Sequence, residues 1–278
     1  MPGDTDDRGT PMLRIAATAL VLTAASASAE EAPRFTLGEP VVSTQGAGPA
    51  IGFTLRAGVG VQPDYFGAEQ GEAAPVFGGT LNYLQLGGFT FGDPDPLFVP
   101  TGPGVNASFR YIGERDDEGG RLTGLDGVDA TLELGAGLSY ATGDVRVFGD
   151  VRYGLFGHEA FVGEIGADFF LRPTDRLTLR AGPRALFGTD DYADTYFGVT
   201  PGESAASGGR FGSFDADGGL ISAGVEVGAG YQISRNWGVD AVVTYERLRG
   251  DAADSPITTD DGQVSASIGV TRRFTLGF

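Results

Sequence analysis

The chain has 278 residues, no cysteine and a formal net charge of −18. The missing cysteines exclude disulfides, thiolate metal sites and a cysteine nucleophile. Such an acidic chain is also a poor candidate for binding nucleic acid, which selects basic surfaces.

The N-terminus has the features of an export signal. Arg14 precedes an apolar run from Ile15 to Ala25, and Ala27-Ser28-Ala29 supplies small residues for cleavage. The apolar run is too short to cross a bilayer as a helix. We therefore expect residues 1–29 to be a cleaved signal peptide, with Met12 as the true start because the polar, acidic residues before it fit poorly there. Residues 30–49 are then a short periplasmic segment.

From residue 50 onwards, segments of about ten residues alternate between apolar and polar side chains, which is typical of membrane barrels. Ile51 to Val61 is the first clear segment. The further candidates are 76–86, 89–91, 105–111, 132–140, 145–155, 161–172, 177–187, 221–231, 237–245 and 264–278. Bacterial single-chain barrels have an even number of strands. We therefore predict an all-β protein: a closed antiparallel transmembrane β-barrel over residues 50–278, with twelve strands, or ten as the alternative. The candidate segments number eleven, so one strand of the twelve is not accounted for, and we expect it in 89–98 or 210–220.

Charged residues fall on one predicted face of four consecutive strands. They are Glu133, Arg146, Asp150, Arg152, Glu164, Asp168, Arg180 and Arg184. On a lipid face each would cost about 2–4 kcal/mol near the midplane. We expect them to point into the lumen and pair across strands, which predicts a filled interior rather than an open pore. A soluble sheet would carry similar charges, but it does not explain why the other face is apolar in every strand.

The final strand alternates up to the last residue, with Phe274, Leu276 and Phe278 on its apolar face. A closing strand of an outer-membrane barrel needs such a face, because its outer surface meets lipid. The terminal aromatic residue also resembles the signal that bacterial barrels present to the barrel assembly machinery. These three residues are therefore a predicted assembly signal. The expected location is the outer membrane of a Gram-negative cell.

The segments between strands include two long polar loops, 189–219 and 249–262, which are typical of extracellular loops. A third, strongly charged loop covers 113–129, and the sequence does not fix its side of the membrane. The sequences of two of these loops resemble motifs of the family of MltA-interacting protein and OmpV. The resemblance rests on Asp194 to Gly208 and on Leu248 to Ile257, with a further similar stretch from Leu122 to Gly135. Pro63 to Gly67 matches only in part, since Phe66 and Ala68 depart from the family pattern.

The matching loop residues singled out are Tyr196, Phe197, Gly198, Ser204, Ser207, Gly208, Gly250, Asp251, Asp254, Ser255 and Pro256. The resemblance implies an outer-membrane barrel. By family analogy it also implies a scaffold that brings a lytic murein transglycosylase together with a bifunctional penicillin-binding protein in peptidoglycan assembly. Family members are also linked to adhesion and to envelope stress, so a surface role is an alternative.

Catalytic and metal-binding motifs are weak. His158 is the only histidine and lies in a short predicted turn beside Glu159, where a solvated residue is more common than a catalytic base. The Asp-rich loops lack the spacing of a calcium-binding loop, and no glycine motif is placed to bind phosphate. We expect no enzyme activity and no cofactor. The hypotheses are a scaffold, a small-solute channel suggested by the charged lumen, and a barrel enzyme that uses His158.

Overall fold

The computed structural model describes residues 34–37, 48–92, 101–115 and 120–278. The predicted signal peptide (1–29), the predicted start Met12 and most of the predicted periplasmic segment lie outside the described residues. Gly48 and Pro49 lead directly into the first long strand.

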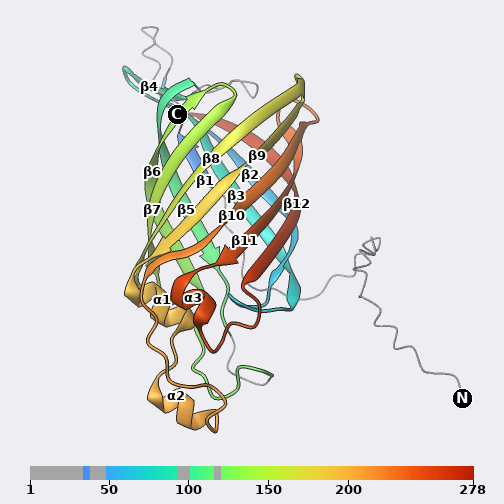
Figure 1. Cartoon of the computed structure of the whole chain (residues 1–278). Coiled ribbons are helices and arrows are strands. Elements are labelled where there is room, and N and C mark those ends of the chain that lie inside the picture. Colours follow the sequence, from blue (N-terminus) through green and yellow to red (C-terminus); the bar gives the residue numbers. More distant parts are fainter. Residues whose placement is uncertain (1–33, 38–47, 93–100, 116–119) are drawn as a thin grey trace, which may run out of the picture.

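One antiparallel sheet of twelve strands forms a barrel-shaped wall (Figure 1). The strands are β1 (Arg34–Leu37), β2 (Ala50–Pro63), β3 (Gly71–Leu86), β4 (Phe89–Gly92), β5 (Thr101–Ile112), β6 (Thr131–Thr142), β7 (Val145–Leu155), β8 (Phe161–Thr174), β9 (Leu177–Gly188), β10 (Gly219–Gln232), β11 (Trp237–Leu248) and β12 (Gly262–Gly277). The hydrogen-bonded order runs from β1 through β5 to β12, and then through β2 and β3 to β4. The predicted number of strands and their antiparallel pairing are confirmed. Among the described residues no hydrogen-bonded pair joins the two ends of this order, so a closed barrel stays a prediction.

The strand that the sequence did not predict is β1. It pairs with β5, with Arg34 opposite Ser108 and Leu37 opposite Val105, and it also lies beside β3. It therefore comes from residues 30–49, and from neither of the two segments in which the missing strand was expected. Within 210–220, Phe214 makes a single bridge to Val199, and Gly219 already belongs to β10. Four residues are too few to show a period of two in the sequence.

The wall has a buried polar face and an exposed apolar face. In β6, Glu133 is fully buried, whereas Leu138 is 69% exposed. Phe77 in β3 and Leu171 in β8, both 63% exposed, continue the apolar surface around the barrel. Large apolar patches are rare on soluble monomers, but an apolar outer band is what a lipid bilayer requires.

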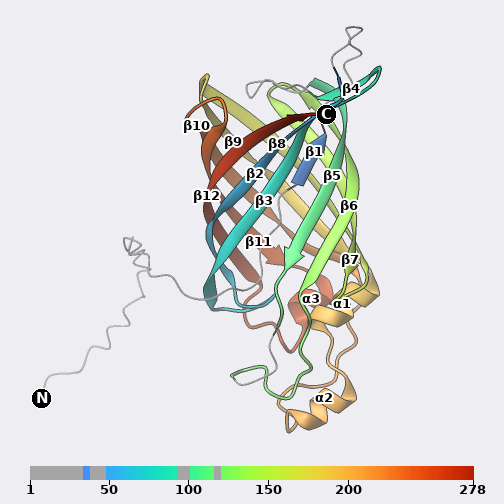
Figure 2. The same cartoon turned by 180° about the vertical axis from the view of Figure 1, so that it is seen from behind.

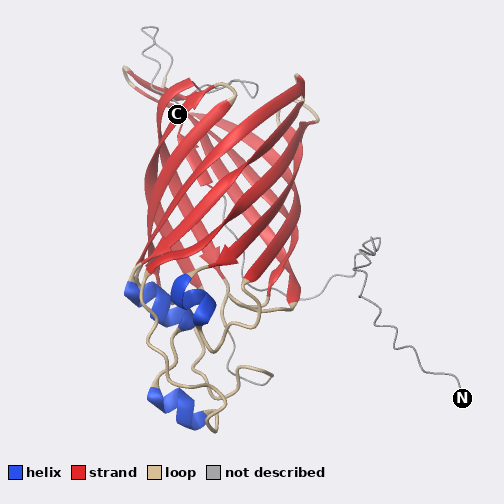
Figure 3. Cartoon of the chain, viewed as in Figure 1, coloured by secondary structure: helices blue, strands red, loops and turns tan. Residues whose placement is uncertain are grey.

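The two ends of the barrel differ (Figure 2). At the end that carries the C-terminus, tight turns connect β6 to β7, β8 to β9 and β10 to β11. Three short helices lie at the opposite end (Figure 3): α1 (Asp190–Phe197), α2 (Pro201–Ala206) and α3 (Gly250–Asp254). No helix in the described part of the chain is long and apolar enough to cross a membrane.

Candidate functional site

The long loops fold together into a cap on the helical end of the barrel. We define the cap as residues 113–115, 120–130, 189–218 and 249–261. Its main buried cluster joins helices α1 and α3 to the rim of the wall, with Tyr192, Phe197 and Ala252 almost fully buried. The Ser255 hydroxyl donates a 2.6 Å hydrogen bond to the Phe197 carbonyl oxygen. The loops after β9 and after β11 are therefore joined through a buried contact.

Segments that carry the family resemblance meet in this cap. Leu122 and Leu125 pack with Val199, Phe211 and Ile257 in a second buried cluster. Gly124, with φ +97°, lies so close to the end of α2 that a Cβ atom would come within 2.6 Å of the Ser207 Cα atom. A side chain at this position would therefore push the 120–130 loop away from α2.

The other motif residues form helix ends and turns. Tyr196 and Phe197 are buried in the last turn of α1, and the Gly198 N–H donates to the Asp194 carbonyl oxygen at 2.9 Å. Around α2, the Ser207 hydroxyl donates to the Ser204 carbonyl oxygen at 2.9 Å, and Gly208 has φ +70°. The remaining motif residues lie in α3 or directly after it. Gly250 begins the helix with φ +52°, Asp251 follows it, and Asp254 ends the helix. Ser255 and Pro256 come next in the chain. Asp251 accepts a 2.8 Å hydrogen bond from the Asp217 N–H.

Glu203 connects α2 to the 120–130 loop. Thr200 and Glu203 form a capping box, in which the Thr200 hydroxyl accepts from the Glu203 N–H and the Glu203 carboxylate accepts from the Thr200 N–H at 2.7 Å. The other carboxylate oxygen accepts from the Asp126 N–H at 2.8 Å. Burial alone would raise the pKa of Glu203, but these hydrogen bonds and the nearby Arg115 outweigh it and hold the pKa below its usual value.

His158 is buried beneath α1 and is not a solvated turn residue. Its Nδ1 atom accepts a 3.0 Å hydrogen bond from the Ala160 N–H, so the proton of the neutral ring lies on Nε2, 3.2 Å from the Glu133 carboxylate. The rings of Tyr192 and Tyr196 lie 5.0 and 5.7 Å away. Both ring nitrogens are therefore used within the fold. Burial also raises the pKa of Tyr196 to about 12, so its hydroxyl stays protonated.

A first group of charges lies inside the barrel near the cap. The Arg152 guanidinium bonds to Glu133 at 2.7 Å, to Glu164 at 3.2 Å and to the Ser108 hydroxyl at 3.2 Å. These contacts connect four consecutive strands, from β5 to β8. Asp150 is also buried, and it lies so close to Gly137 that a Cβ atom there would overlap its carboxylate.

A second group of charges connects β7 to β10. The Asp168 carboxylate contacts Arg146 at 2.5 Å, Arg180 at 3.8 Å and also Arg184. Arg180 and Arg184 both reach Glu226 on β10. Glu226 was not singled out from the sequence, although it occupies a polar-face position of the alternating pattern in β10.

Arg184 also compensates for a proline in the sheet. Pro183 has no N–H to donate, and the pairing of β8 with β9 skips from Gly166–Arg184 to Phe169–Ala181. The Arg184 guanidinium instead donates to the Ala167 carbonyl oxygen at 2.8 Å. Seven of the eight predicted lumen charges take part in the ion pairs above, and Asp150 is buried beside them.

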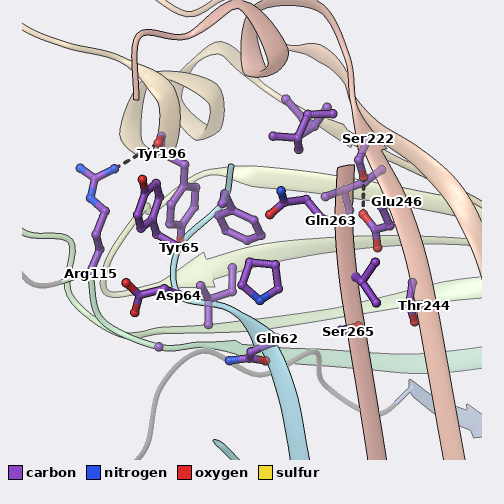
Figure 4. Close-up of a pocket in the computed structure, with 18 of the residues that line it drawn as sticks. Gln62, Asp64, Tyr65, Arg115, Tyr196, Ser222, Thr244, Glu246, Gln263 and Ser265 are labelled. Atoms are coloured by element: carbon purple, nitrogen blue, oxygen red, sulfur yellow. Dashed lines mark hydrogen bonds between the residues drawn. The ribbon is translucent and has the colours of Figure 1, made fainter. Parts of the chain in front are cut away.

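A cavity of about 100 Å³ lies between the cap and the wall (Figure 4). Tyr65 and Arg115 line it on one side, and Gln263 lines it beneath the cap. Arg115 donates to the Tyr196 carbonyl oxygen at 3.1 Å, and burial lowers its pKa from the usual value although Glu203 opposes this. On the wall, the Ser222 hydroxyl donates to Glu246 at 2.6 Å. Of the lining residues named here, only Tyr196 was singled out from the sequence, because the others converge from strands and loops far apart in the chain.

The predicted assembly-signal residues lie at the other end of the barrel. Phe274 stacks on Phe53 with ring centroids 5.2 Å apart, while Leu276 and Phe278 are 52% and 72% exposed. The Phe278 N–H donates to the Pro49 carbonyl oxygen at 2.9 Å. The chain end is therefore joined to the segment that leads into β2, and its apolar side chains face outward.

The described residues contain no group of three or more His, Asp or Glu side chains that could hold a metal ion. The polar groups that do converge are ion pairs within the barrel and hydrogen bonds within the cap. Such an arrangement holds strands and loops in place, and His158 has no free ring nitrogen with which to act as a base in this state.

A family model described as MltA-interacting protein MipA matches residues 55–274. No curated protein matches the chain. Solved structures with a similar chain path include an outer membrane channel from Pseudomonas putida F1, at 11% identity and TM-score 0.42, covering 84% of this chain and 98% of that one. Another is the translocator domain of the autotransporter NalP from Neisseria meningitidis, at 15% identity and TM-score 0.38, covering 84% and 91%. Scores this low do not indicate a shared function.

Proposed function

The chain belongs to the family of MltA-interacting protein MipA, and we propose that it is a non-enzymatic outer-membrane barrel that serves as a scaffold in peptidoglycan assembly. Its partners would be a lytic murein transglycosylase and a bifunctional penicillin-binding protein. The observation that carries the proposal is the family match over most of the barrel, from residue 55 to residue 274. Because a shared fold does not by itself carry function, the proposal also has to agree with the chemistry of the interior.

The interior favours a scaffold over a channel. Two groups of ion pairs join neighbouring strands on its inner side, one around Arg152 and one around Asp168, and the cap covers one end. An open pore needs a continuous water-filled path, whereas oppositely charged side chains pair along the inner side from β6 to β10. A small-solute channel is therefore the less favoured alternative. Adhesion or a stress-response role would use the cap surface, and no contact in the cap favours it.

The interior also argues against catalysis. A general base needs a ring nitrogen that can accept the proton of a substrate. In His158, Nδ1 already accepts from Ala160 and Nε2 bonds to Glu133, and the side chain is fully buried. We therefore assign His158 to the packing of α1 on the barrel.

The end with tight turns is the surface that we expect murein enzymes to contact. In bacterial barrels short turns face the periplasm and long loops face outward, and murein lies in the periplasm. The turn between β6 and β7 presents Asp144, whose side chain is 88% exposed. The turns after β8 and β10 present Arg176 and Arg235.

The test is affinity capture of the tagged mature protein from its native envelope after mild crosslinking, with mass spectrometry of the captured proteins. We expect a lytic transglycosylase or a penicillin-binding protein, and we expect the double variant R176Q/R235Q to capture at least several-fold less. The matched control R249Q removes an arginine at the cap end and should capture as much as wild type. Recovery of the assembly machinery alone, with both variants unchanged, would contradict the proposal.

A further inference from the structure

The outer face of the long strands is almost free of charge. Along β12 the outward positions are apolar from Val264 to Val270, and the alternation then places an arginine, Arg272, outward and exposed before Phe274. On the neighbouring β11 the outward series ends in Arg247. Arg247 and Arg272 therefore lie at opposite ends of the same part of the wall.

The two arginines have different surroundings. Arg247 forms an ion pair with Asp261 at 2.8 Å, so its charge is neutralised at the rim of the cap. For Arg272, the described residues provide no carboxylate within ion-pair distance and no side-chain hydrogen-bond acceptor. Its guanidinium carbon instead lies 4.9 Å from the ring centroid of Trp237 and 4.9 Å from that of Phe274.

These rings hold the arginine against the wall. Trp237 is directly opposite Arg272 in the register of β11 and β12, and Phe274 is two residues further along the same face. Phe274 is itself stacked on Phe53 of β2. A guanidinium that stacks on aromatic rings keeps its N–H donors free at the edge of its plane. It is therefore positioned to bind an acceptor that approaches from outside the barrel.

Arg272 lies at the boundary of the apolar band near the end with tight turns. Trp237 is the first residue of β11, and the turn from 233 to 236 precedes it. Tryptophan and other aromatic side chains gather at the level of lipid headgroups. A charged residue that faces lipid is costly at the midplane but much less so at this level, and phosphate groups lie there.

We propose that Arg272, held between Trp237 and Phe274, binds the phosphate of an anionic glycerophospholipid of the adjacent leaflet, such as phosphatidylglycerol. A planar guanidinium can donate two parallel N–H bonds to phosphate oxygens. Val270 and Leu55 flank the site with apolar surface on which an acyl chain can lie. This inference rests on the proposal that the barrel spans the outer membrane, but it is independent of the scaffold role.

Native mass spectrometry of the refolded mature protein in detergent tests the proposal. Phosphatidylglycerol would be titrated against wild type, R272Q and the matched control R247Q, with phosphatidylcholine and inorganic phosphate as comparison probes. We expect wild type to retain one phosphatidylglycerol, R272Q to bind it about fivefold more weakly, as roughly 1 kcal/mol per interfacial arginine implies, and R247Q to match wild type. The variant R272K should fall between wild type and R272Q, because lysine keeps the charge but not the planar fork.

Two further measurements separate a defect in folding from a defect in lipid binding. Heat-modifiable migration in gels and circular dichroism report whether each variant folds, and binding is compared only between proteins that fold as wild type does, with R272K in place of R272Q if R272Q does not fold. Equal binding by folded wild type and R272Q would overturn the phospholipid site. Displacement of the lipid by millimolar inorganic phosphate would also overturn it, since the site would then be a general anion site.

Discussion

At the scale of single residues, Glu203 is the titratable group that most directly connects two parts of the cap. Its carboxylate accepts from the backbone N–H groups of Thr200 and Asp126, and its pKa is held below the usual value although burial opposes this. A carboxylate with a lowered folded pKa stabilises the folded state above its unfolded pKa, about 4.3, and loses that contribution as the pH falls through the lower folded pKa.

The variant E203Q should therefore destabilise the cap by roughly 1–2 kcal/mol at pH 7, because hydrogen bonds to a charged acceptor are stronger than those to an amide. Hydrogen exchange of residues 120–130 and 199–208 measures this. In wild type, the protection of these segments should decrease as the pH falls below about 4.3, while E203Q should show little further change. The control S204A removes a nearby hydroxyl and should behave as wild type. Equal protection of all three proteins at pH 7 would show that Glu203 does not hold the cap together.

At the scale of strands, the Arg152 group is the clearest determinant of wall stability. One guanidinium forms ion pairs with two buried carboxylates, Glu133 and Glu164, from the two neighbouring strands. Removing one partner of a buried ion pair leaves an uncompensated charge in a medium that solvates it poorly.

The variant R152M should lower the free energy of unfolding by about 3–5 kcal/mol, measured by urea titration of the refolded barrel. The control R247M breaks an exposed pair with Asp261, which water already screens, and should change stability little. If R152M unfolds at the same urea concentration as wild type, the buried ion pairs do not stabilise the wall.

The strands also show where sequence patterns suffice and where they do not. Alternation predicts the ten long strands because each has one face toward lipid and one toward a polar interior, which imposes a period of two. It does not predict β1, since four residues are too short to show a period and their pairing with β5 is a contact across about seventy residues. It also leaves the cap as loop, because α1, α2 and α3 are short and depend on tertiary contacts such as that of Ser255 with Phe197.

The candidate site was likewise predictable only where it depends on the alternation of side chains along a strand. The eight charges from Glu133 to Arg184 were selected by their common face. Glu226 and His158 were not placed among them, because their roles depend on which strands and loops become neighbours. The loop motifs directed attention to the cap. The cavity lining, including Tyr65, Arg115 and Gln263, becomes visible only when six strands and a helix are brought together.

At the scale of the whole molecule, the interior and the surface have separate roles. The interior carries charges that neutralise one another between β5 and β10, and the cap covers one end of the barrel. The surface carries an apolar band, tight turns at one end and a cap at the other. This division supports a protein that acts through the surfaces it presents, and it disfavours the transport of solutes through the interior.

The most direct test of this account is single-channel recording of the refolded mature protein in a planar lipid bilayer. Wild type should give no regular conductance steps, because paired charges occupy the interior and the cap covers one end of the barrel. A variant that lacks cap residues 189–218 should still give none, since the Arg152 and Asp168 groups remain in the interior. Regular steps from wild type would contradict the account and would favour a small-solute channel.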